Sequence, residues 1–168
     1  MEKAIVGTEL CRCDFTYCSN SCYYFLNAVN NQFMLGQAEI DFLLDGYCIR
    51  KISQLKKVEI NDDKRNELNK LYGVTAEVKM PEVDISSWKS IFDSLKALDR
   101  FIIIEDEING QFSIGIIEKV LQNKLYFKQF DANGVWDEEN LEIPYSQITT
   151  VQWDTRYTNV WERYLRKI

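Results

Sequence analysis

The sequence predicts a mainly β protein with accessory α-helices, in which two tandem small barrels of five strands are each followed by a helix. The first observation behind this prediction is an internal repeat, because residues 52–58 (ISQLKKV) have a counterpart in residues 146–151 (SQITTV). The second is an echo of residues 33–36 (FMLG) in residues 112–115 (FSIG). The third is a series of short branched and aromatic runs separated by turn residues, which is typical of β-strands.

A length of 168 residues allows one domain or two small ones, and the repeat favours two. We expect residues 1–75 to form the first barrel with its closing helix. Residues 76–168 then hold a linking helix, the second barrel and a C-terminal helix. With 46% hydrophobic and 27% charged residues, the composition is that of an ordinary globular protein. Two prolines and seven glycines leave no room for a disordered linker.

The elements of the first barrel follow from short apolar runs and one turn signal, Asp45-Gly46. Its strands are expected within residues 4–29 (two strands), 33–44, 47–52 and 55–60. A helix should begin at Asn61-Asp62-Asp63, because capping oxygens and negative charge stabilise a helix start. The apolar stripe of this helix consists of Leu68, Leu71 and Tyr72.

The second barrel is preceded by a helix that should start at Ser86-Ser87. Its apolar residues recur at helical spacing at Trp88, Ile91, Phe92 and Leu95. Strands are expected at residues 101–104, 112–120, 125–130, 141–145 and 148–153, with turns at 109–110, 123–124 and 131–134. Gly115 falls in mid-strand, where a small closed sheet needs a sharp bend that no side chain obstructs.

The last helix carries an apolar face, which consists of Tyr157, Val160, Trp161, Tyr164, Leu165 and Ile168. Arg163, Arg166 and Lys167 lie near its C-terminus, where the helix dipole favours positive charge. The apolar face could dock a partner. We expect it instead to pack on the protein's own barrels, and we expect Trp88, Phe92, Leu95, Trp161 and Leu165 to be largely buried.

A helix and five short, bent antiparallel strands are the plan of small barrels of the Sm-like and SH3-like kind. From Trp88 to Leu165 the chain resembles an uncharacterised bacterial family with tandem Sm-like modules. The residues that carry the resemblance are Gly115, Asp131, Gly134, Trp136-Asp137, Ile143 and Ile148. They match a strand ending in hydrophobic-Gly, an Asp-x-x-Gly hairpin and an Ile-x-x-x-x-Ile stretch. The resemblance implies a fold and no activity.

A wider resemblance to Sm proteins would imply RNA binding. Whether this implication holds depends on the residues at the positions that contact RNA in Sm proteins. An Asp and an Asn are expected after the strand-two glycine, but Leu121 and Leu125 occupy those places. The later Arg-Gly pair is replaced by Tyr145-Ser146 in one copy and by Ile52-Ser53 in the other. We therefore expect the barrel without the RNA pocket.

Catalysis by the common side-chain systems is excluded, because the sequence contains no histidine, no glycine-rich phosphate loop and no dinucleotide fingerprint. Catalysis by carboxylates alone remains open, but the acidic runs at residues 105–107 and 137–139 fall in turn-like segments and are expected to be solvated surface. We predict a protein that is not an enzyme and uses no cofactor.

Four cysteines fall within twelve residues, at Cys11, Cys13, Cys18 and Cys22, and four thiolates could hold zinc. Their spacing lacks the paired Cys-x-x-Cys of zinc ribbons, and aromatic residues surround them. Because free cysteine is also a small buried hydrophobe, we expect buried thiols and no metal.

Two functional classes remain. The first is a protein-interaction or regulatory module that binds another protein, which suits a net charge of −6. The alternative is an atypical Sm-like nucleic-acid-binding protein, with Arg50, Lys51, Lys56 and Lys57 as its basic cluster. The negative charge disfavours nucleic acid. The sequence does not decide between a monomer and a homo-oligomer.

The longest apolar run, residues 101–104, is far below the ~20 residues of a membrane helix, so no membrane association is expected. No signal segment is recognised either, and we expect a cytoplasmic protein with reduced thiols.

Overall fold

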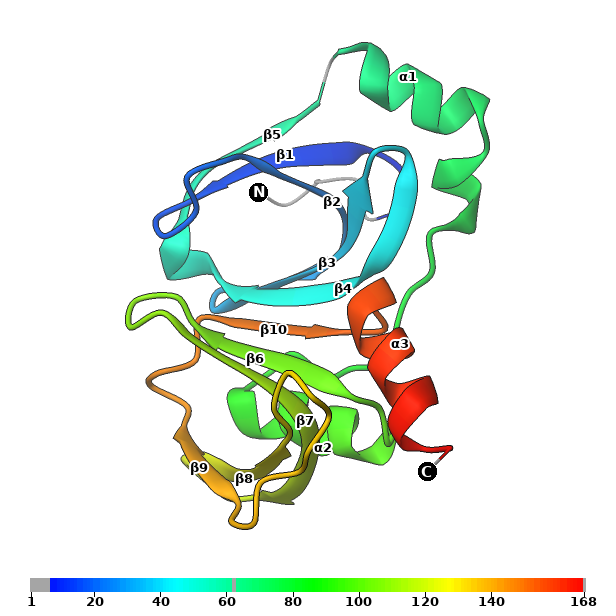
Figure 1. The fold of residues 1–168 in the computed structure, drawn as a ribbon. Coiled ribbons are helices and arrows are strands. Elements are labelled where there is room, and N and C mark those ends of the chain that lie inside the picture. The colour runs from blue at the N-terminus through cyan, green and yellow to red at the C-terminus, as the bar shows by residue number, and fades with distance from the viewer. Residues whose placement is uncertain (1–6, 62, 168) are drawn as a thin grey trace. The chain divides into compact units, whose positions relative to one another are not determined.

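The computed structural model describes residues 7–61 and 63–167 (Figure 1). These residues form two compact units that divide between Pro81 and Glu82, whereas the boundary expected from the sequence lay after residue 75. Both units are mainly β, as predicted, and all strand pairs within each unit are antiparallel. Among the described residues, no helix has both the length and the apolar character that crossing a membrane requires.

Unit 1 is a curved five-stranded sheet followed by a short helix (Figure 1). Its strand order is β5-β1-β2-β3-β4. Its elements are β1 (Leu10–Phe15), β2 (Cys22–Val29), β3 (Phe33–Ile40), β4 (Leu43–Lys51), the 3-10 turn η1 (Ile52–Gln54), β5 (Leu55–Ile60), α1 (Lys64–Leu71) and η2 (Val74–Glu77).

Unit 2 begins with a helix, continues as a five-stranded sheet and ends with a second helix. Its strand order is β10-β6-β7-β8-β9. Its elements are α2 (Trp88–Ala97), β6 (Ile102–Asp106), β7 (Gln111–Val120), β8 (Lys124–Gln129), β9 (Leu141–Pro144), β10 (Thr150–Trp153) and α3 (Arg156–Leu165).

The two units share one strand order: fifth, first, second, third, fourth. Neither sheet closes, because β4 shares no ladder with β5, nor β9 with β10, among the described residues. Closed barrels, as expected from the sequence, are therefore not established by the strand pairing. One physical reason in unit 2 is that β9 is only four residues long and ends at Pro144, which has no amide hydrogen to donate.

The repeated Ser-Gln segment occupies the same place in both units. Ser53 lies in η1 between β4 and β5, and Ser146 lies in the turn between β9 and β10. Val58 then pairs with Cys13 on the first strand of unit 1, and Val151 pairs with Ile104 on the first strand of unit 2. The repeat thus marks the connection from the fourth to the fifth strand.

The glycine echo does not mark equivalent places, and this part of the sequence interpretation is wrong. Gly36 lies in the third strand of its unit, whereas Gly115 lies in the second. Each glycine nonetheless permits a close approach: a Cβ on Gly36 would lie 2.9 Å from Tyr24 Cβ, and one on Gly115 would lie 1.9 Å from the carbonyl oxygen of Lys128. A side chain at Gly115 would thus collide with the backbone of β8, whereas the closed sheet whose bend this glycine was expected to allow is not established.

The turn predicted at Asp45-Gly46 is also wrong. The hairpin between β3 and β4 turns at Asp41 and Phe42, which both have positive φ, 50° and 66°. Asp45 and Gly46 instead form a bulge opposite Ala38, with Gly46 at a φ of 72°. An Asp-Gly pair is common both in tight hairpin turns and in β-bulges, because each needs a residue with left-handed backbone angles.

The core of unit 1 is built around its strands and is rich in thiols. One cluster of buried side chains consists of Cys11, Cys13, Phe15, Tyr24, Leu26, Met34 and Cys48, and a second consists of Leu10, Phe25 and Val74. Helix α1 starts at Asp63, whose carboxylate accepts a hydrogen bond from the amide of Arg65 (2.7 Å). Asp62, within the predicted cap, lies outside the described residues, as do residues 4–6 of the predicted strand region.

The core of unit 2 is closed by its two helices. Ser87 caps α2, as predicted, and Thr155 caps α3. Phe92 and Leu95 are buried, whereas Trp88, Trp161 and Leu165 are only half-buried, so the burial prediction holds in part. On α3 the residues Trp161 and Leu165 pack on a cluster that consists of Phe101, Ile103, Ile114 and Phe130, and Ile168 lies outside the described residues.

Candidate functional site

The cysteines singled out from the sequence lie in and around the core of unit 1. Cys11 and Cys13 on β1 are 3% and 0% exposed, and Cys13 lies opposite Cys22 on β2. Burial, and then the charge of Glu9, raises the pKa of the Cys11 thiol; burial raises the pKa of Cys13 strongly, with a smaller contribution from neighbouring thiols. These thiols therefore stay protonated and behave as small core side chains.

Cys18 and Cys22 pack against the same core and are half-buried. In the described parts of the chain, no group of three or more metal-ligating side chains comes together in a way that could hold an ion. That the purified protein holds no metal stays a prediction.

The positions that the Sm resemblance would place at an RNA site, Leu121 and Leu125, lie in the core of unit 2 or support it. Leu125 is fully buried, and the carbonyl of Leu121 accepts a hydrogen bond from the Tyr145 hydroxyl (2.7 Å). Tyr145 is itself buried and stacks on Phe92 of α2, with ring centroids 5.5 Å apart. Burial raises the pKa of Tyr145 to about 12.

The basic cluster expected at residues 50–57 is divided by the fold. Arg50 is 5% exposed, and its guanidinium lies over the Phe15 ring, 4.5 Å from the centroid. Lys57 pairs with Glu59 (2.5 Å). A continuous basic surface is thus not formed by these residues, because one cation is buried and another is paired within its own strand.

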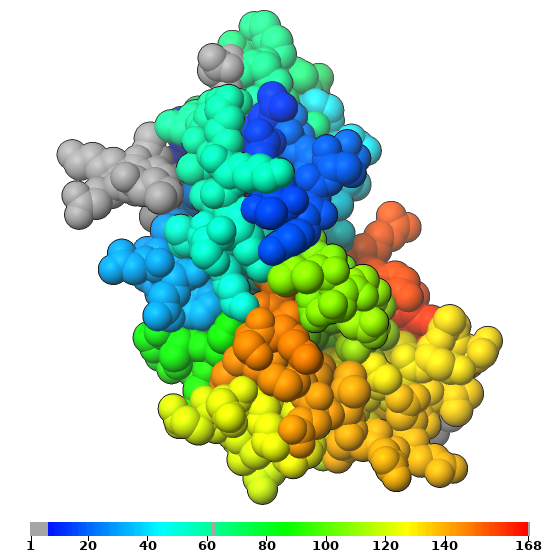
Figure 2. All heavy atoms as spheres, turned by 90° about the vertical axis from the view of Figure 1, so that its left-hand side faces the viewer, coloured from blue at the N-terminus to red at the C-terminus, as the bar shows by residue number. Residues whose placement is uncertain are grey.

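An acidic cleft opens on unit 2 between β6, β7 and the β9–β10 segment. Its volume is about 280 Å³, and its apolar floor includes Ile104, Ile143 and Ile148, all of which are buried. In Figure 2 the orange surface of the β9–β10 segment lies beside the light-green surface of the β6–β7 hairpin. The floor is thus framed by two turn-bearing segments.

Carboxylates form the rim of this cleft. The lining includes Glu105, Asp106 and Glu142 but no Lys or Arg among the described residues. The Asp106 carboxylate accepts from the backbone amides of Ile108 and Asn109, both at 3.2 Å, so it holds the β6–β7 turn. Glu142 is exposed, and its hydrogen bond and ion pair with the ammonium group of Lys124 (2.9 Å) lower the pKa of the carboxyl, which keeps it ionised.

A second hollow, the aromatic pocket, lies between the start of β7, the end of β8, the loop after it and the first turn of α3. It has a volume of about 380 Å³. Its rings come from Phe112, Phe130 and Tyr157, and its carboxylates from Asp131 and Asp137. Phe112 and Tyr157 meet edge to face with ring centroids 6.3 Å apart.

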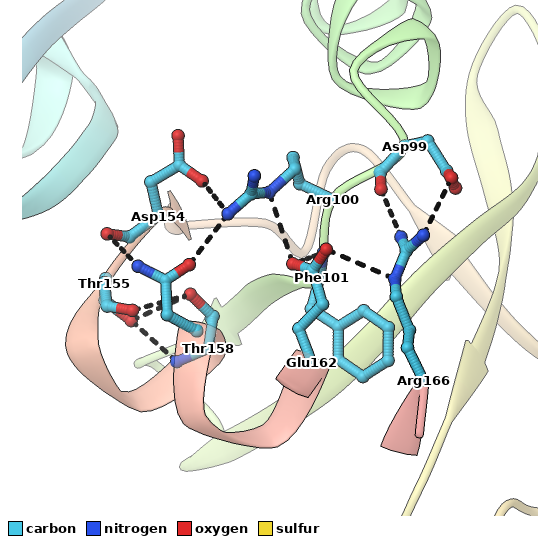
Figure 3. A network of polar contacts seen from close by, with 9 residues as sticks. Asp99, Arg100, Phe101, Asp154, Thr155, Thr158, Glu162 and Arg166 are labelled. Atoms are coloured by element: carbon cyan, nitrogen blue, oxygen red, sulfur yellow. Dashed lines mark hydrogen bonds and ion pairs between the residues drawn. The ribbon is translucent and has the colours of Figure 1, made fainter. Parts of the chain in front are cut away.

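A network of ion pairs fastens α3 to the rest of unit 2 (Figure 3). The carboxylate of Glu162 forms ion pairs with Nε of Arg100 (3.2 Å) and with Nε of Arg166 (3.2 Å), and it accepts a hydrogen bond from the amide of Phe101 (3.3 Å). Arg100 also pairs with Asp154 (2.8 Å). The network therefore joins the start of β6, the residue after β10 and the last turns of α3.

A hollow of about 440 Å³ beside this network is lined by Arg100, Asn159, Glu162, Arg163, Arg166 and Lys167. Arg166 is engaged by Asp99 as well as by Glu162, and both interactions raise the pKa of its guanidinium. Because Arg100 and Arg166 already hold carboxylates, we read this hollow as part of the tether of α3 and not as an anion site.

Sequence reasoning assigned the residues of both sites to other roles. Asp131 was part of a turn, Asp137 part of a solvated acidic run, and Tyr157 part of an apolar helix face. No spacing pattern connects Phe112, the 130–137 segment and Tyr157, because the fold brings them together from separate elements. The signals that the sequence did offer were an aromatic residue near the start of a strand (Phe112), another near the start of a helix (Tyr157) and an acidic turn between them in the sequence.

Comparisons with known proteins add no further constraint on these sites. No protein-family model matches the chain, and no curated protein and no solved structure shows significant similarity to it.

Proposed function

We propose that the protein is a non-enzymatic cytosolic interaction module that binds a basic, partly apolar segment of another protein. The acidic cleft of unit 2 is the proposed site. The observation that carries the proposal is the cleft's composition, in which buried isoleucines form the floor and three carboxylates lie at the rim, one of them, Glu142, paired with Lys124.

Each unit is, in this proposal, an incompletely closed small barrel of the Sm-like or SH3-like kind. Support comes from the strand order that both units share and from the position of the repeated Ser-Gln segment between the fourth and fifth strands. The gap between β9 and β10 is the opening of the barrel, and Ile143 and Ile148 of the cleft floor lie beside it.

A basic segment with an apolar anchor fits this cleft for two physical reasons. An apolar side chain that reaches the isoleucine floor removes hydrophobic surface from water, which for a leucine contributes about 1.5–3 kcal/mol. Lysine or arginine side chains on either side would lie near Glu105 and Glu142, and complementary charge raises both specificity and association rate. The net charge of −6 adds long-range attraction for a cationic partner.

The test is a titration of the whole chain with short fluorescent peptides in which one leucine is flanked by lysine and arginine. Replacing the leucine of the peptide by serine should weaken binding about tenfold, which is 1.4 kcal/mol. Replacing the flanking cations by glutamate should abolish binding. Raising the salt concentration should weaken binding, because exposed charge pairs are screened.

Matched variants locate the peptide on the protein. Glu142→Gln removes a rim charge and should weaken binding several-fold, whereas Glu139→Gln removes the same charge from the exposed β8–β9 connection outside the cleft and should change little. Equal effects of the two variants, or no binding of any peptide, would contradict the proposal. Salt-sensitive binding of an RNA oligonucleotide in place of the peptides would favour the nucleic-acid alternative.

A further inference from the structure

The aromatic pocket of unit 2 has half-exposed rings at its mouth and a buried ring at its base. Phe112 is 51% exposed and Tyr157 is 50% exposed, whereas Phe130 is 5% exposed. Large aromatic side chains normally bury more of their surface in a folded domain. Two such rings around a hollow therefore leave a substantial π surface available to a ligand.

Regular elements hold both mouth rings in place. Phe112 lies on β7 and pairs with Glu105 of the neighbouring strand β6. Tyr157 lies in the first turn of α3, whose start is fixed by the hydrogen bond from the Thr158 amide to the Thr155 hydroxyl (3.0 Å). Rings held by a strand and a capped helix lose little conformational freedom when a ligand binds.

The pocket carries negative charge, but many of its acceptor positions are already used. Asp131 accepts backbone amides from Val135 and Asn133, both at 2.9 Å, and the Asn133 side-chain amide at 3.2 Å. The hydrogen bond from Val135, followed by those from Asn133, lowers the pKa of the Asp131 carboxyl. Asp137 accepts from the side-chain amide of Gln129 (2.7 Å).

The chemistry of the ligand follows from this combination. Aromatic faces attract a cation through the ring quadrupole, and the two carboxylates add a negative field. A primary ammonium would need several free acceptors to replace its water shell. A fully methylated ammonium needs none, and its methyl groups present apolar surface to the rings.

We propose that the aromatic pocket binds a quaternary methylammonium group, with Phe112, Phe130 and Tyr157 as its walls and Asp131 and Asp137 as its counter-charge. The group could belong to a free choline-like molecule or to a trimethylated lysine side chain. The site is separate from the acidic cleft in its lining residues, and the inference does not depend on peptide binding there.

The test compares choline with 3,3-dimethyl-1-butanol, which has the same shape and no charge. Each is titrated into the whole chain and followed by backbone amide chemical shifts in NMR. Choline should shift the amides of residues 131–137 and of the first turn of α3, and should bind about tenfold tighter than the neutral alcohol, as expected for cation–π attraction. A peptide with trimethyllysine, compared with the same peptide carrying unmodified lysine, distinguishes the two sources of the group.

Variants separate the pocket from general effects on folding. Tyr157→Ala should weaken choline binding at least tenfold, Tyr157→Phe should retain it, and Val160→Ala on the same helix should leave it unchanged. Asp137→Asn should weaken binding without changing the thermal midpoint. Equal affinity for choline and the neutral alcohol, no binding of either, or equal effects of Tyr157→Ala and Val160→Ala would overturn the proposal.

Discussion

Replacing Gly115 with alanine should unfold unit 2 more readily than any other small change in its sheet. Gly115 pairs with Ile102 on one side and with Gln129 on the other, so it lies between two strands. A Cβ there would lie 1.9 Å from the carbonyl oxygen of Lys128 and 2.9 Å from its carbonyl carbon. Since these are backbone atoms, no side chain can rotate away to make room.

The magnitude follows from the separation that the strands would need. Moving the Lys128 oxygen out to an ordinary contact of about 3 Å or more requires β7 and β8 to part by roughly 1 Å, which stretches the adjoining ladder hydrogen bonds beyond their normal range. Two such bonds contribute about 1 kcal/mol each, and backbone distortion adds to the loss. We expect a total of about 3–5 kcal/mol, or a fall in the thermal midpoint of ~10 °C or more.

Tryptophan fluorescence is a suitable readout for urea and thermal unfolding, because all four tryptophans of the chain lie in unit 2. The matched control is Gly110→Ala, at a glycine with a φ of 65° and nothing within 4 Å of an added Cβ. That variant should cost only about 1 kcal/mol of backbone strain. If Gly115→Ala proved as mild as Gly110→Ala, the close approach of β7 and β8 would be refuted.

Three further outcomes are expected. Trp161→Ala should destabilise unit 2 by about 2–3 kcal/mol, below the 3–5 of a fully buried aromatic, because the ring is only half-buried where it contacts Phe130 (ring centroids 5.1 Å apart). An unchanged urea midpoint would make the α3 face a partner surface instead. The purified protein should contain no stoichiometric metal and keep its melting temperature in chelator. Because Cys13 is fully buried, its thiol should resist thiol reagents until the protein unfolds. One zinc per chain, lost on Cys11→Ser, would contradict the prediction of no metal. The pKa of the Asp131 carboxyl is lower in the folded state than in the unfolded state. The ionised carboxylate therefore stabilises the fold at pH values above the unfolded-state pKa, and this stabilisation is lost as the pH falls through the folded-state pKa. Acid titration of Asp131→Asn should therefore show a shallower loss of stability than wild type, and identical curves would contradict the role of the Val135 and Asn133 amides.

Much of the chain's organisation was readable from the sequence because local signals agreed with the fold. The strands of unit 2 and the cap at Ser87 were placed by turn residues and apolar runs, and the repeated Ser-Gln segment marked the same connection twice. The predicted Asp45-Gly46 turn failed for a local reason: the actual turn uses Asp41 and Phe42, neither of which carries the usual glycine signal.

The sites were less predictable than the strands. The acidic cleft requires the β6–β7 and β9–β10 segments to meet, and the aromatic pocket requires Phe112 to lie beside Tyr157. Such proximity depends on strand order and on how α3 docks, and neither follows from the spacing of residues along the chain. The sequence shows that the chain is acidic, but it does not show that Glu105, Asp106 and Glu142 gather around buried isoleucines.

The ion-pair network at Glu162 makes the aromatic pocket conditional on a docked helix. Tyr157 is on α3, which Glu162 ties to Arg100 and to the Phe101 amide in addition to the packing of the helix on the core. When α3 opens locally, the pocket loses a wall, so a ligand that binds there must draw the equilibrium toward the docked state. Amide hydrogen exchange along α3 should then slow as more of the protein is bound to ligand. The exchange rate of this helix would therefore report how much ligand is bound.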